Sequence, residues 1–231
     1  MKNDPRPVTF VPSVDTGEAA ARNRACLRFA GDLFTGKDVL DVGCWTGGFL
    51  SLIEGSAGRA SAIDVDPAAL AVARRNLPGA RFVESSVLEM PFEDESFDVV
   101  TMWAVLEHLP AGCEPAALGE IRRVLRPGGH IALNVPNANL VARSLDPIFW
   151  LKGHRHYSLA QVEKMLETSG FTLERSTVQS GMISLAAFIF FCFWKYLVRR
   201  PEPSWPRYRQ ACERDANRTG FVELFALARK R

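Results

Sequence analysis

Short runs rich in β-branched residues alternate with amphipathic stretches along most of this 231-residue chain. The strand-like runs are VLDV, SAID, RFVE, FDVVTM and HIALNV, and segments with helical spacing separate them. This alternation favours a parallel sheet with helices on both faces. The length suits one sizeable core, so we expect a single domain over residues 1–231.

The helix boundaries in the sequence agree with this pattern. In DPAALAVARRN, Asp66 is an expected N-cap, and Pro67 takes the first helical position, where a missing N–H costs nothing. In SLAQVEKMLETSGF, Ser158 and Gln161 predict a capping box, and Gly170 predicts the end of the helix.

The segment VLDVGCWTGGFL, residues 39–50, resembles a strand that leads into a nucleotide-binding turn. In a doubly wound sheet, ligands bind beyond the carboxyl ends of the strands, at such a turn. Gly43 and Gly47 would let the backbone bend and approach a ligand closely. Trp45 stands where a G-x-G-x-x-G pattern has its second glycine, whose small size admits a pyrophosphate. Trp45 therefore disfavours a dinucleotide, and with it a nicotinamide-dependent dehydrogenase.

Two aspartates stand at the ends of the first two predicted strands. Asp41 ends the first strand, and Asp64 ends the second, 21 residues after Gly43. A carboxylate at the second position can accept hydrogen bonds from two ribose hydroxyls. Aspartates at strand ends can also merely cap or turn the chain. The combination with the glycine turn favours the ribose-binding role.

Five segments then occur in a fixed order: VLDVGCWTG, AIDVDP, MPFEDESFDVVTMWAVLEHLP, EIRRVLRPGGHIALNVPN and HRHYSLAQVEKMLETSGF. They resemble the class I methyltransferases that depend on S-adenosylmethionine (SAM), of the small-molecule type 11/23 group that includes ubiquinone-type O-methyltransferases. The resemblance covers roughly residues 25–178 and 221–229. It implies SAM as the cofactor. It also implies a Rossmann-like, doubly wound, mostly parallel seven-stranded sheet whose last strand is antiparallel.

The resemblance also implies which residues would hold the methionine and ribose parts of SAM. Asp41, Gly43, Cys44 and Gly47 match the family's loop around the methionine part. Asp64 matches the acid that binds the ribose.

Three further positions match the family's adenine site. Val65 corresponds to an apolar contact with adenine, and Val87 to a backbone N–H that reaches it. Ser86 stands where the family often has an aspartate that accepts from the adenine amino group, so only a hydroxyl is available here. The family usually has glycine at the position of Trp45.

The expected chemistry is an in-line displacement, in which a positioned nucleophile gains mostly from proximity and orientation. A base helps if the acceptor is a hydroxyl. His108, in VLEHLP, follows the fourth strand near the expected acceptor, and an imidazole suits this role. His108 could instead orient a loop or cap a helix. Glu107 is expected to be a structural partner, because carboxylates are poor bases for an alcohol proton.

A second polar cluster, KGHRHYS, precedes a predicted helix. The resemblance places this segment over the substrate side, so we expect His154, His156 and Tyr157 to line the acceptor site. A metal held by His154 and His156 is the alternative. Two histidines separated by one residue indicate a metal only weakly without a third ligand. The five cysteines form no CxxC pair, so no metal centre is expected.

An apolar segment interrupts the pattern between GFTLERSTV and GFVELFALARK, within an insertion at residues 179–218. Residues 185–194, LAAFIFFCFW, are ten consecutive apolar positions, whereas a membrane-spanning helix needs about 20. A helix that is apolar all round must be covered. The body of the domain, a second subunit or a lipid surface could cover it.

The segment after the apolar run is basic. Residues 195–231 contain ten Lys or Arg against four Asp or Glu, and RRPEPSWPRYR combines arginines with Trp205 and Tyr208. This mixture favours contact of residues 183–209 with an anionic membrane surface, although basic faces are often simply solvated. No nucleic-acid-binding motif occurs, so we expect no nucleic acid partner. The N-terminal sequence lacks the apolar core of a secretory signal, so the expected location is cytoplasmic and peripheral to the membrane.

These features together predict O-methylation of a small or lipid-linked acceptor with SAM. Two alternatives stay open: methylation of a saccharide or glycolipid hydroxyl, and a non-catalytic SAM-binding scaffold that recruits partners through the insertion. The sequence leaves the oligomeric state open.

Overall fold

The computed structural model describes residues 17–194, 198 and 205–231. The expected lack of a secretory signal concerns residues 1–16, which lie outside this part. Residues 195–197 and 199–204, which belong to the basic segment, also lie outside the described residues.

The described chain forms one seven-stranded sheet in the order β3-β2-β1-β4-β5-β7-β6. Strands β1 to β5 pair in parallel, and β7 pairs antiparallel with both β5 and β6. This arrangement confirms the predicted doubly wound, mostly parallel sheet with an antiparallel last strand. The strands are β1 (Asp38–Val42), β2 (Arg59–Asp64), β3 (Arg81–Glu84), β4 (Phe97–Trp103), β5 (Leu125–Pro136), β6 (Phe171–Gln179) and β7 (Glu223–Lys230).

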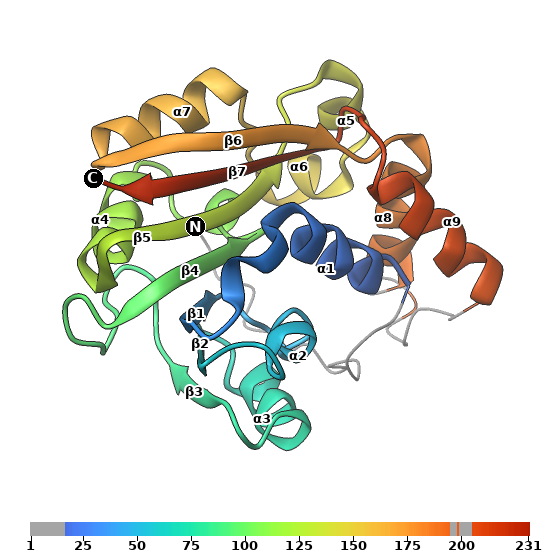
Figure 1. Ribbon diagram of the computed structural model, residues 1–231. Coiled ribbons are helices and arrows are strands. Elements are labelled where there is room, and N and C mark those ends of the chain that lie inside the picture. The colour runs from blue at the N-terminus through green and yellow to red at the C-terminus, as the bar shows by residue number, and fades with distance from the viewer. Residues whose placement is uncertain (1–16, 195–197, 199–204) are drawn as a thin grey trace.

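Helices flank the sheet, and α1 crosses in front of it in Figure 1. The Asp66 side chain accepts hydrogen bonds from two N–H groups of α3, and Ser158 and Gln161 form the predicted capping box of α7. The helices are α1 (Gly17–Ala30), η1 (Gly31–Phe34), α2 (Leu50–Ile53), α3 (Pro67–Asn76), η2 (Leu106–His108), α4 (Glu114–Val124), α5 (Leu140–Leu145), α6 (Pro147–Lys152), α7 (Leu159–Thr168), α8 (Met182–Phe193) and α9 (Pro206–Ala216).

The central strands bury both of their faces. Leu40, Val100 and Ile131 lie in one core cluster, which α4 and α7 complete. Val39 and Val99 point the other way, into a second cluster that α1 and α3 complete. Because neighbouring side chains of a strand alternate between faces, the central strands read as near-continuous apolar runs.

The apolar insertion forms α8 and α9, which lie together at the right of Figure 1, opposite the marked C-terminus. Helix α8 contacts α1, α5, α6 and α9, so the domain covers one side of it. Its buried side chains include Leu185, Ala187 and Cys192. Its exposed ones include Met182, Ile183, Ile189 and Phe193. Among the described residues, none of the helices is long and apolar enough to cross a membrane.

Candidate functional site

The turn after β1 depends on two glycines in the left-handed region. Gly43 has φ +73°, and a Cβ there would lie 2.3 Å from Val105 Cγ2. Gly47 has φ +81°, and a Cβ there would lie 2.9 Å from Leu77 Cδ1. Both positions therefore require glycine. The contact with Val105 also places the turn directly against the loop that follows β4.

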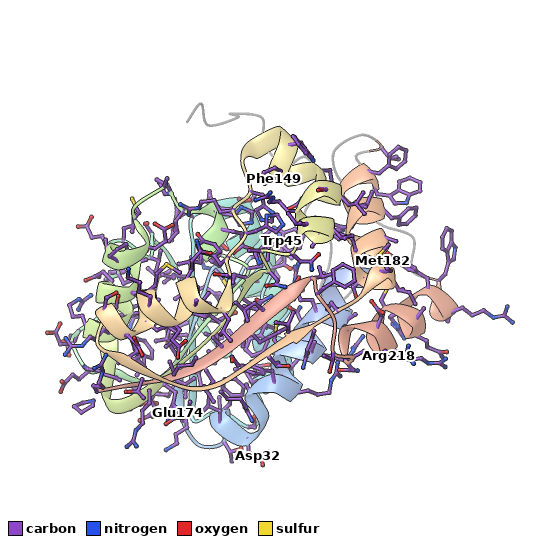
Figure 2. All side chains as sticks on the ribbon, turned by 90° about the horizontal axis from the view of Figure 1, so that it is seen from above. Asp32, Trp45, Phe149, Glu174, Met182 and Arg218 are labelled. Atoms are coloured by element: carbon purple, nitrogen blue, oxygen red, sulfur yellow. The ribbon has the colours of Figure 1, made fainter. Side chains whose placement is uncertain are left out.

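Trp45 adopts the backbone conformation that glycine favours. Its φ is +47°, which costs a non-glycine residue about 1–2 kcal/mol. The Trp45 N–H donates to Asp64 Oδ2 at 2.7 Å, so the strained residue is tied to the end of β2. Figure 2 shows Trp45 on the same side of the molecule as Phe149, with Asp32 on the opposite side.

The carboxylate of Asp64 is held by the backbone on both oxygens. Oδ1 accepts from the Asp66 N–H at 2.9 Å, and Oδ2 accepts from Trp45. Burial raises the pKa of Asp64, and these N–H groups partly offset the effect. Each oxygen keeps a lone pair for a ribose hydroxyl. The neighbouring Val65 side chain is 70% exposed, an apolar surface beside the fixed acid.

Asp41 is a buried acid at the end of β1. Burial raises its pKa to about 7, although Thr101 Oγ1 donates to its Oδ1 at 2.6 Å, which acts in the opposite direction. The Cys44 side chain is buried in the core, and its N–H donates to the Ile63 carbonyl at 3.1 Å. Burial also raises the pKa of the Cys44 thiol. Cys44 can therefore shape the turn, but its thiol is enclosed by protein.

The predicted adenine residues follow β3. Ser86 Oγ accepts from the Leu88 N–H at 3.1 Å, so this hydroxyl also organises its own loop. The Val87 side chain is buried in the core. The contacts of both residues with adenine stay predictions.

The residues from Asp41 to Val65 fit SAM. The positive φ angles of Gly43 and Gly47 give the turn the sharp bend that a ligand-binding loop needs after a strand. Asp64 offers a fixed carboxylate, and Val65 offers an exposed apolar side chain. The left-handed Trp45 occupies the position that a pyrophosphate-binding turn reserves for glycine.

The loop after β4 leads into the second half of the site. Ala104 has φ +52°, and its N–H donates to Asn134 Oδ1 at 2.9 Å, which fixes the exit from β4. The chain then enters η2, which carries Glu107 and His108. Glu107 is only 4% exposed, whereas His108 lies at the surface.

His154 meets this loop from a distant part of the chain. Its ring stacks on that of His108, with 4.9 Å between centroids. Its Nδ1 donates to Asp146 Oδ2 at 2.7 Å, and its Nε2 lies 3.7 Å from Glu107 Oε1. Burial alone would lower the pKa of His154, but the hydrogen bond to Asp146 and the nearby carboxylates of Glu107 and Asp146 raise it to about 9.

His156 joins the same cluster, but Tyr157 does not. His156 Nε2 lies 3.5 Å from Asp146 Oδ2, and burial lowers the pKa of His156. Tyr157 packs in the core, and its hydroxyl donates to the Leu106 carbonyl at 3.3 Å. Burial raises the pKa of Tyr157. The structure therefore brings two of the three predicted substrate residues to one place.

A cavity adjoins the histidines. Glu107, Asp146, His154 and His156 line it together with residues of α1, α8, α9 and β7, which include the charged Arg22 and Glu223. The Phe188 ring of α8 lies 6.5 Å from that of His154 and nearly parallel to it. Sequence reasoning did not identify Asp146 or the cavity-facing role of Glu107. Neither Asp146 nor Glu107 belongs to a sequence motif that would indicate a place in the cavity.

The central part of the chain matches a known family. Residues 40–133 match the family described as a methyltransferase domain. A probable SAM-dependent methyltransferase from Mycolicibacterium smegmatis is 34% identical over 139 residues, 60% of this chain and 53% of that protein. A probable phthiotriol/phenolphthiotriol dimycocerosates methyltransferase 2 from Mycobacterium ulcerans is 43% identical over 102 residues, 42% of this chain and 39% of that protein. The chain thus spans about half or less of these relatives.

The fold also matches a solved structure with a bound cofactor product. The 1,6-didemethyltoxoflavin-N1-methyltransferase of Burkholderia thailandensis was solved with 1,6-didemethyltoxoflavin and S-adenosylhomocysteine. Its TM-score is 0.61 at 19% identity, with coverage of 92% of this chain and 79% of that one. At this level of identity, the similarity concerns the fold.

Proposed function

We propose that this chain, which belongs to the class I family of SAM-dependent methyltransferases, methylates a hydroxyl of a lipid-linked acceptor in the cavity beside His154. SAM supplies a methyl group that its sulfonium already activates. The S–CH₃ bond breaks as the O–CH₃ bond forms, which yields the methyl ether, S-adenosylhomocysteine and one proton. The chain's main contribution is then to hold donor and acceptor in line.

The residues divide between the two reactants. The turn at residues 41–47 and the Asp64 carboxylate would hold SAM, and the cavity would hold the acceptor. The Gly43 turn packs on Val105, two residues before Glu107, so the two sites adjoin. His108 is the last residue of η2, and its ring stacks on that of His154. We propose that it accepts the hydroxyl proton.

The apolar surface around the cavity carries the proposal of a lipid-linked acceptor. Ala142 of α5 and Leu185 and Phe188 of α8 line the cavity. The outer sides of the same helices, and of α6 between them, expose large apolar side chains, so an acyl or prenyl tail could continue from the cavity onto this surface. These side chains are Leu140, Val141, Leu145, Trp150, Met182, Ile183, Ile189 and Phe193. The M. ulcerans relative, named for dimycocerosates, supports the same class of acceptor.

The surroundings of this apolar face suit an anionic bilayer. Helix α9 packs against α8 and begins beside Trp205, which is 57% exposed. Arg207 and Arg209 are exposed in its first turn. Aromatic and basic side chains beside an apolar face are typical of peripheral membrane proteins. We therefore propose docking through the described part of residues 183–209, which would deliver a membrane-embedded acceptor to the cavity.

The test follows the transferred methyl group. The chain is incubated with methyl-labelled SAM and fractionated cell extract, and the label is then partitioned between organic and aqueous phases. We expect label in the organic phase, together with release of S-adenosylhomocysteine. Label confined to an aqueous saccharide would favour the glycan acceptor instead. Binding of SAM without product in any fraction would favour the scaffold.

A further inference from the structure

We propose that Glu107, His108 and His154 form a site for a divalent transition metal ion of the Zn²⁺ type, with a fourth position open to the cavity. One oxygen of Glu107 and one nitrogen of each histidine lie within 4.8 Å of one another. Glu107 Oε1 lies 3.7 Å from His154 Nε2. Tetrahedral ligands at bond lengths of about 2.0–2.1 Å lie about 3.4 Å apart, so only small side-chain shifts are needed.

Asp146 holds His154 in the orientation that a metal ligand needs. The imidazole donates from Nδ1 to Asp146 Oδ2 at 2.7 Å, so its Nε2 faces Glu107. Histidines that bind metals almost always donate their other nitrogen to a carboxylate, a carbonyl or water. The stacked His108 is exposed, and one of its ring nitrogens lies within 4.8 Å of the ligand atoms of Glu107 and His154.

Two atoms of this cluster are buried with no hydrogen-bond partner in the described part of the chain. They are Glu107 Oε2 and His154 Nε2, on side chains that are 1% and 7% exposed. Buried polar atoms normally have partners, and buried charges are paired or bind metals. Glu107 and Asp146 place two buried carboxylates around one imidazole, so a divalent cation would balance their charge.

The ion would add a chemical role that rests on the proposed function. A metal at this point could bind the acceptor hydroxyl and make it more acidic, with the proton released to water. One nitrogen of His108 would then be committed to the ion. Acidification by the metal would thus replace proton removal by His108.

The site can be tested without any methyl acceptor. The whole chain is stripped with a chelator and titrated with Co²⁺, which reports its coordination through visible absorption, and Zn²⁺ is then added as a competitor. We expect one equivalent to bind with the spectrum of nitrogen and oxygen ligands. Glu107→Gln and His108→Gln should abolish this spectrum. Asp146→Asn should weaken binding by about 10–100-fold, the usual effect of losing a partner of a ligand.

His130→Gln is the matched control. His130 also lies beside a carboxylate, Glu174 at 3.2 Å, but belongs to β5 outside the cluster. This variant should bind Co²⁺ as the parent chain does, and circular dichroism and melting should show that every variant is folded. The proposal is overturned if folded Glu107→Gln and His108→Gln bind Co²⁺ like the parent chain, if a thiolate charge-transfer band shows cysteine ligands, or if no stoichiometric complex forms. Methyl transfer by the stripped chain in that last case would leave the proposed function intact and remove only the metal.

Discussion

Asp41 shows how the ionisation of one buried side chain can oppose folding. It is 2% exposed at the end of β1, near the charge of Asp64, and burial raises its pKa from 3.8 to about 7. The folded chain therefore binds this proton more tightly than the unfolded chain does. The contribution of Asp41 to stability is most favourable below about pH 4, and it declines as the pH rises to about 7.

Replacement of Asp41 by Asn should remove this pH dependence. Asn keeps an oxygen to accept the Thr101 hydroxyl but carries no charge. At pH 8 the free energy of unfolding should rise by about 2–4 kcal/mol, and at pH 4 it should change little. Urea unfolding at the two pH values measures both quantities. A variant that is less stable than the parent chain at pH 8 would show that the ionised carboxylate has compensating partners in the fold.

For single residues, the sequence predicts some features of the candidate site but not others. The turn at Gly43 and Gly47 and the place of Asp64 at the end of β2 could be predicted, because glycine spacing and strand ends can be recognised from residue types. The left-handed conformation of Trp45 could not be predicted from its residue type, because the energy of that conformation depends on the Asp64 hydrogen bond. The contact between Glu107 and His154 was also unpredictable, because it joins two loops far apart in the sequence.

At the scale of elements, α8 has two different faces. Leu185 and Ala187 pack against the domain, while Ile183 and Phe193 are exposed. The sequence predicts that the apolar segment in α8 must be shielded from water. A helix that is apolar all round, however, gives no pattern to indicate which of its sides packs against the protein. Helix α1 could not be predicted from the sequence because its apolar pattern is weak rather than uniform. Its buried face consists largely of small residues such as Ala21 and Ala25, which give a weak apolar pattern.

Replacement of Ile183 by Asp should weaken membrane docking. Ile183 is 45% exposed in the first turn of α8, where an acidic side chain is compatible with the helix. Loss of its apolar contact should cost about 1–2 kcal/mol of membrane affinity, roughly a tenfold effect. Flotation with vesicles that contain anionic lipid measures the bound fraction.

Leu159→Asp provides the matched control for this experiment. Leu159 is 40% exposed and begins α7, away from α8. The control should float like the parent chain. Equal flotation of both variants and the parent, or no flotation of the parent chain, would count against docking through α8.

At the scale of the whole molecule, SAM should stabilise the folded chain by mass action. At a concentration one hundred times its Kd, a ligand that binds only the folded state adds about 2.7 kcal/mol. A chain of this size should then melt about 5–10 °C higher. Val65→Asp should reduce this shift, because loss of the apolar contact with adenine costs about 1 kcal/mol of binding. Thermal melting with and without SAM measures the effect.

Two controls give this experiment its meaning. Leu159→Asp makes the same kind of substitution on an exposed residue far from the turn, and should keep the full shift. NAD should give no shift with the parent chain. A larger shift with NAD than with SAM would overturn the assignment of the cofactor.

The sheet order also has a consequence for how the protein is made. Strand β7, Glu223–Lys230, lies between β5 and β6, so those two strands never pair with each other. On the ribosome, which adds about 5–20 residues per second, the edge of β5 waits several seconds for residues 137–222 to be synthesised before its partner exists. An unpaired edge recruits strands from other chains. A messenger RNA that is truncated within the codons for residues 137–222 therefore encodes an aggregation-prone product rather than a smaller working protein.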